Sequence, residues 1–228
     1  ISEWFNGDKK FKELIKEFPS EKEAHVLLSD YYLLNDQFEE ALQILNQLIL
    51  IDPNSESIRL TISDLYLQKG EILKCVQEMN KAFLSEKINI QAKINSLAKF
   101  LELLEKEKQL INEAEDLCDL LIKTHDEDPI AHYFCAEFFR EIDSKRKALI
   151  EYQNTIELDP NIQEAWINLL FLSMELKEKE ILSEKSNEAI SFFPTNPIFY
   201  YIRGVFLYDQ ENFNELIRIL NIGVEFSS

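Results

Sequence analysis

His132 and Cys135 lie three positions apart, and in a helix this spacing places both side chains on one face. An imidazole and a thiolate so placed could share a metal ion. A zinc site needs three or four ligands, however, and the cysteine spacing of this chain fits no zinc motif. His25 also occupies the same place as His132 in an earlier sequence repeat, which favours a packing role. We therefore expect neither a metal nor a cofactor.

The other residues capable of chemistry form no catalytic pattern. Cys75, Cys118 and Cys135 each fall on an apolar helical position, where a free cysteine behaves as a small buried hydrophobe. The 42 aspartates and glutamates are spread along the chain, so no pair stands out as an acid and a base. Phosphate-binding loops, HExxH motifs and nucleophile elbows do not occur. We therefore predict that this chain, within its 228 residues, is not an enzyme.

Composition favours a helical chain. Of 228 residues, 46% are hydrophobic, but only four are Gly and six are Pro, too few for the many turns of a sandwich or barrel. The net charge of −18 opposes binding to nucleic acid and favours a basic protein or peptide as partner. The sequence holds no run of about 18 apolar residues, so we expect no membrane span. We expect a soluble protein, cytoplasmic or, if a signal segment has been removed, periplasmic.

The sequence repeats itself. EEALQILNQLILIDPN at 39–54 and KALIEYQNTIELDPN at 147–161 share an alanine, a Leu/Ile run and a closing Asp-Pro-Asn. Pro160 and Pro194 are 34 residues apart, and Pro53 precedes Pro160 by three such steps plus five residues. A period of this size indicates stacked helix pairs that bury their apolar faces against one another.

AHVLLSDYYLLNDQFEEALQILNQLILIDPN, AHYFCAEFFREIDSKRKALIEYQNTIELDPN and PIFYYIRGVFLYDQENFNELIRIL carry the repeat most clearly. With its large, small and aromatic positions on the first helix and a closing proline, the repeat resembles the tetratricopeptide repeat (TPR) family. The resemblance implies an all-α fold, a right-handed α-solenoid of antiparallel helix pairs. About six repeats are predicted, at residues 22–55, 56–89, 91–128, 129–162, 163–196 and 197–228. The one at 91–128 has extra residues within LEKEKQLINE.

Residues 1–21 are predicted to hold the second helix of a truncated leading repeat, because KKFKELIKEFPS places its apolar residues on one helical face. No polar capping helix follows the last repeat. We therefore expect the chain to be part of a longer array or protein, or to have its ends covered by another molecule.

In this family the first helices line a concave groove, in which a partner peptide or helix lies. The resemblance therefore implies that residues one turn apart on the first helices line the groove. The predicted groove residues are Val26, Asp30, Leu60, Asp64, Tyr133, Glu137, Ile167, Phe171, Tyr201, Val205 and Tyr208. The groove is expected to be acidic at one end and apolar at the other, and it lacks the basic clamp by which one branch of the family grips carboxylates.

The apolar members, from Ile167 to Tyr208, fit an amphipathic or aromatic partner segment with a basic flank. They fit equally well a packing role against the next helix or against a missing unit. The predicted function is a non-catalytic protein-interaction scaffold. The alternatives are a regulatory or substrate-recognition arm of a larger enzyme, whose catalytic domain lies outside this chain, and an RNA-binding repeat, which the net charge disfavours.

Overall fold

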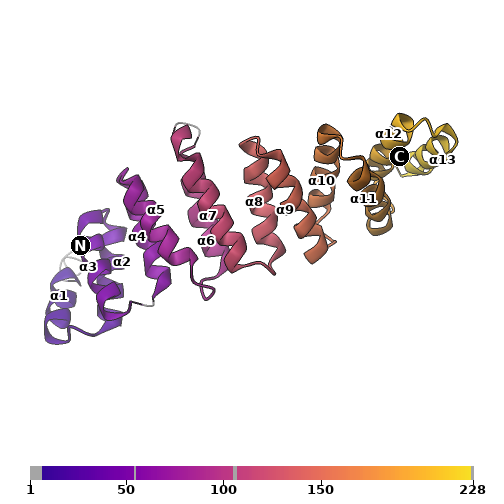
Figure 1. Cartoon of the computed structure of the whole chain (residues 1–228). Coiled ribbons are helices and arrows are strands. Elements are labelled where there is room, and N and C mark those ends of the chain that lie inside the picture. Colours follow the sequence, from indigo (N-terminus) through magenta and orange to yellow (C-terminus); the bar gives the residue numbers. More distant parts are fainter. Residues whose placement is uncertain (1–6, 54, 105–106, 227–228) are drawn as a thin grey trace. The chain divides into compact units, whose positions relative to one another are not determined.

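The computed structural model describes residues 7–53, 55–104 and 107–226, so parts of the predicted leading segment, of the 91–128 repeat and of the last repeat lie outside it. Within the described residues the chain is all-α and has no strand. It divides into two compact units that meet between Thr124 and His125. Each unit is a stack of antiparallel helix pairs (Figure 1), so the predicted fold class, an all-α solenoid of helix pairs, is confirmed.

The first unit begins with α1, which packs against the first helix pair. Its helices are α1 (Gly7–Glu17), α2 (Lys22–Leu34), α3 (Phe38–Ile51), α4 (Glu56–Gln68), α5 (Ile72–Phe83), α6 (Ile90–Leu101), η2 (Lys108–Leu110) and α7 (Ile111–Thr124). The pairs are α2 with α3, α4 with α5 and α6 with α7. The short 3₁₀-helix η2 lies in the link between α6 and α7, within the LEKEKQLINE segment.

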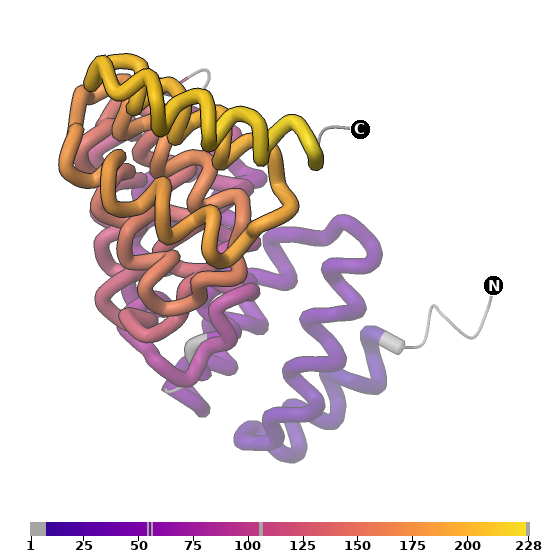
Figure 2. Tube along the Cα trace, turned by 90° about the vertical axis from the view of Figure 1, so that its right-hand side faces the viewer, coloured from indigo at the N-terminus to yellow at the C-terminus, as the bar shows by residue number. Residues whose placement is uncertain are grey.

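The second unit contains three helix pairs. Its helices are α8 (Pro129–Glu141), α9 (Lys145–Leu158), α10 (Gln163–Leu176), α11 (Lys179–Phe192), α12 (Pro197–Asp209) and α13 (Phe213–Glu225). Two of the second helices, α9 and α11, pack both against their own first helix and against the first helix of the next pair, as α9 does with α8 and α10. The last helix, α13, packs against α12 and lies at the edge of the unit, in yellow in Figure 2.

Local sequence explains where several helices begin. The Asp128 carboxylate accepts a hydrogen bond from the backbone N–H of Ile130 at 2.9 Å, and Asn196 accepts one from Ile198 at 3.1 Å. Both cap residues are followed by a proline at the first helical position, where a missing N–H costs nothing. The first helices of two pairs therefore start at sequence-encoded caps.

The turns within the pairs share one backbone conformation. A residue with positive φ stands in five of them, and these residues are Asp36, Gly70, Asp143, Lys177 and Glu211. The residue after each donates its backbone N–H to a carbonyl five positions back, as Glu178 does to Ser173 at 2.9 Å. This is the Schellman ending of a helix, which satisfies carbonyls left free in the last turn. The link between α6 and α7 has no such residue in its described part, which agrees with its greater length.

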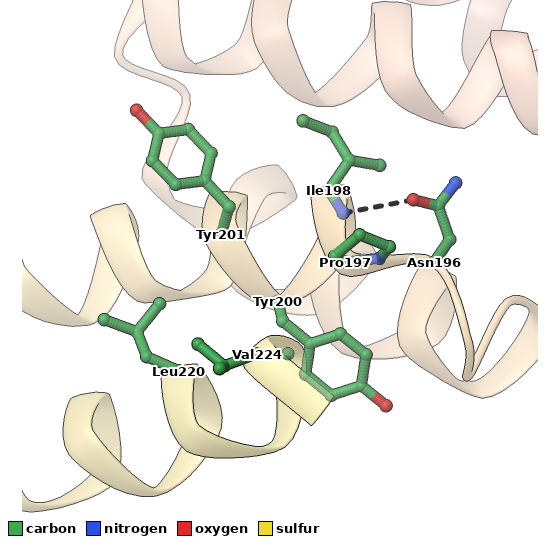
Figure 3. Close-up of a pocket in the computed structure, with 8 residues that line it drawn as sticks. Asn196, Pro197, Ile198, Tyr200, Tyr201, Leu220 and Val224 are labelled. Atoms are coloured by element: carbon green, nitrogen blue, oxygen red, sulfur yellow. Dashed lines mark hydrogen bonds between the residues drawn. The ribbon is translucent and has the colours of Figure 1, made fainter. Parts of the chain in front are cut away.

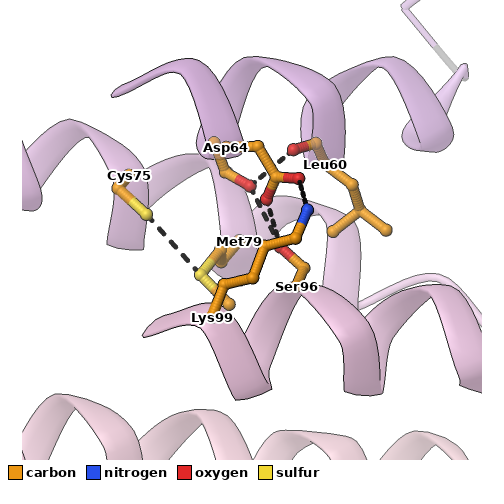
Figure 4. Close-up of polar contacts among 7 residues, drawn as sticks. Leu60, Asp64, Cys75, Met79, Ser96 and Lys99 are labelled. Atoms are coloured by element: carbon orange, nitrogen blue, oxygen red, sulfur yellow. Dashed lines mark hydrogen bonds and ion pairs between the residues drawn. The ribbon is translucent and has the colours of Figure 1, made fainter. Parts of the chain in front are cut away.

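The cysteines lie in the core, as predicted. Cys75, Cys118 and Cys135 are all buried, and the Cys75 thiol lies 3.7 Å from the Met79 sulfur (Figure 4). Burial, with a smaller contribution from Asp64, raises the pKa of Cys75 to about 12. The Cys75 thiol is therefore protonated at neutral pH and chemically inert.

Candidate functional site

The first-helix face of the first unit offers less free surface and less free charge than the sequence predicts. Val26 and Asp30 of α2 are exposed, but Leu60 of α4 is only 7% exposed and presents little to a partner. Asp64 is partly buried, and its carboxylate accepts a hydrogen bond from Ser96 at 3.0 Å and pairs with Lys99, both on α6 (Figure 4). The negative charge of Asp64 is therefore balanced within the protein.

The second unit repeats this arrangement at Glu137 of α8. One carboxylate oxygen of Glu137 accepts hydrogen bonds from the Tyr152 hydroxyl at 2.5 Å and the Asn168 amide at 2.7 Å. The other oxygen pairs with Arg140 at 2.6 Å. Burial and then the Glu137 carboxylate raise the pKa of the Tyr152 hydroxyl, which stays protonated and donates.

Asp64 and Glu137 thus have the same structural role. Each is a first-helix carboxylate that accepts a hydrogen bond from a polar residue on the next first helix, Ser96 in one case and Asn168 in the other. The sequence predicts both acids as groove residues but gives no sign of their partners. Such contacts join residues some 30 positions apart, and only the stacking of the helices brings them together.

The apolar part of the predicted face is exposed on α10 and α12. Phe171 is 42% exposed, Tyr201 54% and Tyr208 62%, whereas Ile167 and Val205 are half-buried. The two helices that carry them pack against each other. We call these five residues the aromatic strip. Tyr133, on α8, is half-buried, and its ring lies 6.2 Å from that of Tyr152, so it belongs to the Glu137 cluster.

A pocket of about 380 Å³ adjoins the strip at Tyr201. Figure 3 shows the side chains around it: Ile198 and Tyr201 come from α12, and Leu220 and Val224 come from α13. Sequence analysis did not include Ile198 or Val224 among its candidate residues. The recurrence of apolar residues at 213, 217, 220 and 224 is the signal that could have found this face of α13.

His132, the sequence-level candidate for a metal ligand, has both ring nitrogens engaged by the protein. Nδ1 lies 2.6 Å from a carboxylate oxygen of Glu151, and Nε2 lies 3.0 Å from the backbone carbonyl oxygen of Asp126. The described residues contain no group of three or more His, Cys, Asp or Glu placed to hold a metal ion. His132 is therefore a structural tie between α9 and the segment that precedes α8.

The described helices include none that is both long enough and apolar enough to cross a membrane.

Comparisons with known proteins agree with the helix-pair architecture. The family model for the tetratricopeptide repeat matches residues 9–65, which hold α2, α3 and most of α1 and α4. Residues 9–65 therefore match the tetratricopeptide repeat, the family that the sequence predicts. No curated protein matches the sequence significantly.

Several solved structures are similar. MamA is 16% identical, with a TM-score of 0.47, over 87% of this chain and 94% of that chain. YrrB, a TPR protein with an unusual peptide-binding site, is 13% identical, with a TM-score of 0.45, over 95% of this chain and 92% of its own. A tetratricopeptide repeat protein from Parabacteroides merdae is 14% identical, with a TM-score of 0.45, over 96% and 81%.

Proposed function

We propose that this chain is a non-catalytic interaction scaffold that binds a peptide or helix of a partner protein on the first-helix face of its second unit. The observation that carries this proposal is the exposure of three large aromatic side chains, Phe171, Tyr201 and Tyr208, on two first helices that pack together. Aromatic side chains at a protein surface supply much of the binding energy of interfaces, because they bury large area at low entropic cost.

The chemistry of the partner follows from charge. The chain has a formal net charge of −18. A basic segment with apolar or aromatic side chains would satisfy both the strip and this overall field. Because Asp64 and Glu137 are already paired within the protein, the attraction is expected to be diffuse rather than to come from a specific clamp.

The test is a double variant, Phe171→Glu with Tyr201→Glu, compared with Ile150→Glu. Ile150 is 53% exposed on α9, a second helix, and so makes a matched control for placing a charge on an exposed apolar site. Partners captured from the native cell extract on the immobilised wild-type chain would be identified, purified and titrated against all three proteins by fluorescence anisotropy.

Loss of binding by the double variant, with unchanged helicity by circular dichroism and full binding by Ile150→Glu, would support the proposal. A partner that binds the double variant as tightly as the wild type would refute it. A basic partner should also bind more weakly as salt rises, because mobile ions screen the attraction.

A further inference from the structure

The last helix of the second unit has an apolar face that is largely exposed in the described structure. Its residues are Phe213, Ile217, Leu220 and Val224, which we call the outer α13 face; Leu220, 37% exposed, packs in part against Gly204 of α12. Ile217 is 61% exposed and Val224 is 68% exposed. The spacing of these residues places them along one side of a helix. Four large apolar side chains in a row form a contiguous surface, which in soluble proteins marks an interaction site.

The same chain shows what covers these positions elsewhere. Counting back 34 residues from Ile217 and Leu220 leads to Ser183 and Ser186 of α11. The Ser183 carbonyl and the Ser186 hydroxyl accept hydrogen bonds from Arg203 of α12 at 2.9 and 3.4 Å.

One repeat earlier the equivalent residues are Leu149 and Tyr152 of α9, which are both buried. Tyr152 contacts Glu137 and Arg140 of α8, its own first helix, and α9 also packs against α10. On α11, therefore, these positions contact the next first helix, α12.

The pocket described above extends the outer α13 face toward α12. Leu220 and Val224 form part of its wall, with Ile198 and Tyr201 of α12. Its volume of about 380 Å³ is large enough to receive side chains of a docked segment. A helix lying on α13 would thus find both a flat apolar face and a hollow at its α12 edge.

The rim of the outer α13 face is acidic. Asp209 and Glu211 are exposed in and beside the turn between α12 and α13. The two arginines of these helices are already engaged, since Arg203 donates to α11 and Arg218 pairs with Glu215 at 2.5 Å. The unbalanced charge around this face is negative, and it favours a positively charged partner.

We propose that the outer α13 face binds an amphipathic helix of a partner protein, seated on α13 as α12 is seated on α11. The side chains that α12 buries include Phe199, Ile202 and Phe206, which lie along one side of the helix, so the partner helix carries large apolar residues at positions i, i+3 and i+7. Lysine or arginine flanks this apolar edge. The site lies on a second helix and goes beyond the proposed function, which uses the first-helix strip.

The test uses the full chain and a synthetic helical probe. The probe is a labelled peptide with Phe, Ile and Phe at i, i+3 and i+7 and lysines on its flanks, and a second peptide replaces the lysines with glutamates. Anisotropy titration is expected to show saturable binding of the lysine peptide and at least tenfold weaker binding of the glutamate peptide. Ile217→Glu and Val224→Glu, both at exposed positions and checked for unchanged helicity by circular dichroism, should each weaken binding of the lysine peptide at least tenfold. Ile150→Glu should not weaken it.

Three results would overturn the proposal. The first is binding that Ile217→Glu and Val224→Glu leave unchanged. The second is binding lost only with Phe171→Glu, a residue that does not line the pocket, which would place the peptide on the aromatic strip. The third is a concentration-dependent dimer in sedimentation velocity that Ile217→Glu dissociates, which would make a second copy the occupant. Failure here leaves the Phe171 test intact, so the two proposals can fail separately.

Discussion

The Asn168 amide donates a 2.7 Å hydrogen bond to the Glu137 carboxylate and so ties α10 to α8, two first helices that are not neighbours in sequence. The same carboxylate accepts from Tyr152 of α9. Glu137 therefore joins three helices of the second unit at one point. A residue that the sequence marks as a surface acid acts as an internal tie.

Removing the Glu137 carboxylate should destabilise the second unit. Glu137→Leu leaves the buried Tyr152 hydroxyl without its carboxylate acceptor, and an unsatisfied buried polar group costs about 1 to 3 kcal/mol. Tyr152→Phe removes the hydroxyl instead. In urea unfolding, the double variant should be less destabilised than the sum of the two single variants. Strict additivity would show that the two groups do not interact.

The stability of the second unit should fall as pH rises near neutrality, because of His132. Burial lowers the pKa of His132, but the hydrogen bonds with Glu151 and Asp126 outweigh burial and raise the pKa above its usual value near 6.5. A carboxylate and a carbonyl are both acceptors, so the protonated ring satisfies both. The contribution to stability is complete below about pH 6.5 and is lost as pH rises through the raised pKa.

Thermal unfolding midpoints measured between pH 5 and pH 8.5 check this expectation. The wild type should lose more stability over this range than His132→Gln, which keeps a polar side chain but does not titrate. Because His25 and His125 remain in the variant, the difference between the two curves isolates His132. Parallel curves would contradict the expectation.

Replacement by alanine should destabilise the protein more at Gly223, on α13, than at Gly204, on α12, although both glycines lie at the contact between these two helices. A Cβ on Gly223 would stand 2.6 Å from the Cβ of Tyr200, an atom next to the backbone that cannot move away. A Cβ on Gly204 would meet the end of the Leu220 side chain at 2.7 Å, which can rotate toward solvent. We expect Gly223→Ala to cost about 1 to 3 kcal/mol, as overpacking does, and Gly204→Ala to cost less. Urea denaturation of the two variants gives the comparison directly.

Introducing a glycine at one positive-φ turn position and removing a glycine from another should change the stability in opposite directions. Lys177 has φ of 59°, a conformation that is strained for a residue with a Cβ. Lys177→Gly removes this strain and should therefore stabilise the chain by up to about 1 kcal/mol. Gly70 has φ of 72°, and a Cβ added there would meet nothing within 4 Å, so Gly70→Ala should destabilise through backbone strain alone, by about 1 kcal/mol. Chemical unfolding midpoints that move the same way in both variants would contradict this account.

The helix pairs could be predicted from sequence because their core positions recur with a fixed period. Leu28, Ala41 and Leu45 are buried where the repeat predicts, and so are Ala148 and Ala189 in the second unit. The link between α6 and α7 also matches the extra residues seen in sequence. Apolar periodicity reports which face is inside, and the stack of helix pairs follows from it.

The polar contacts could not be predicted in the same way. Lys93 would be expected on a helix surface, yet it is fully buried and donates to the Phe83 carbonyl at 2.9 Å and to the Thr124 hydroxyl at 3.1 Å. The Lys93 amine, on α6, thus satisfies a backbone carbonyl at the C-terminal end of α5. Which polar residue meets which depends on the packing of helices, and a single sequence carries no periodic signal for such contacts.

Because each unit contains a buried cysteine, the local unfolding of each unit can be measured through the reactivity of its own thiols. A thiol-alkylating reagent can react only when a fluctuation brings the sulfur to solvent, because Cys75 and Cys118 in the first unit and Cys135 in the second are shielded in the native state. Alkylation followed by mass spectrometry would therefore time the local unfolding of the two units separately, in one sample, without any introduced label.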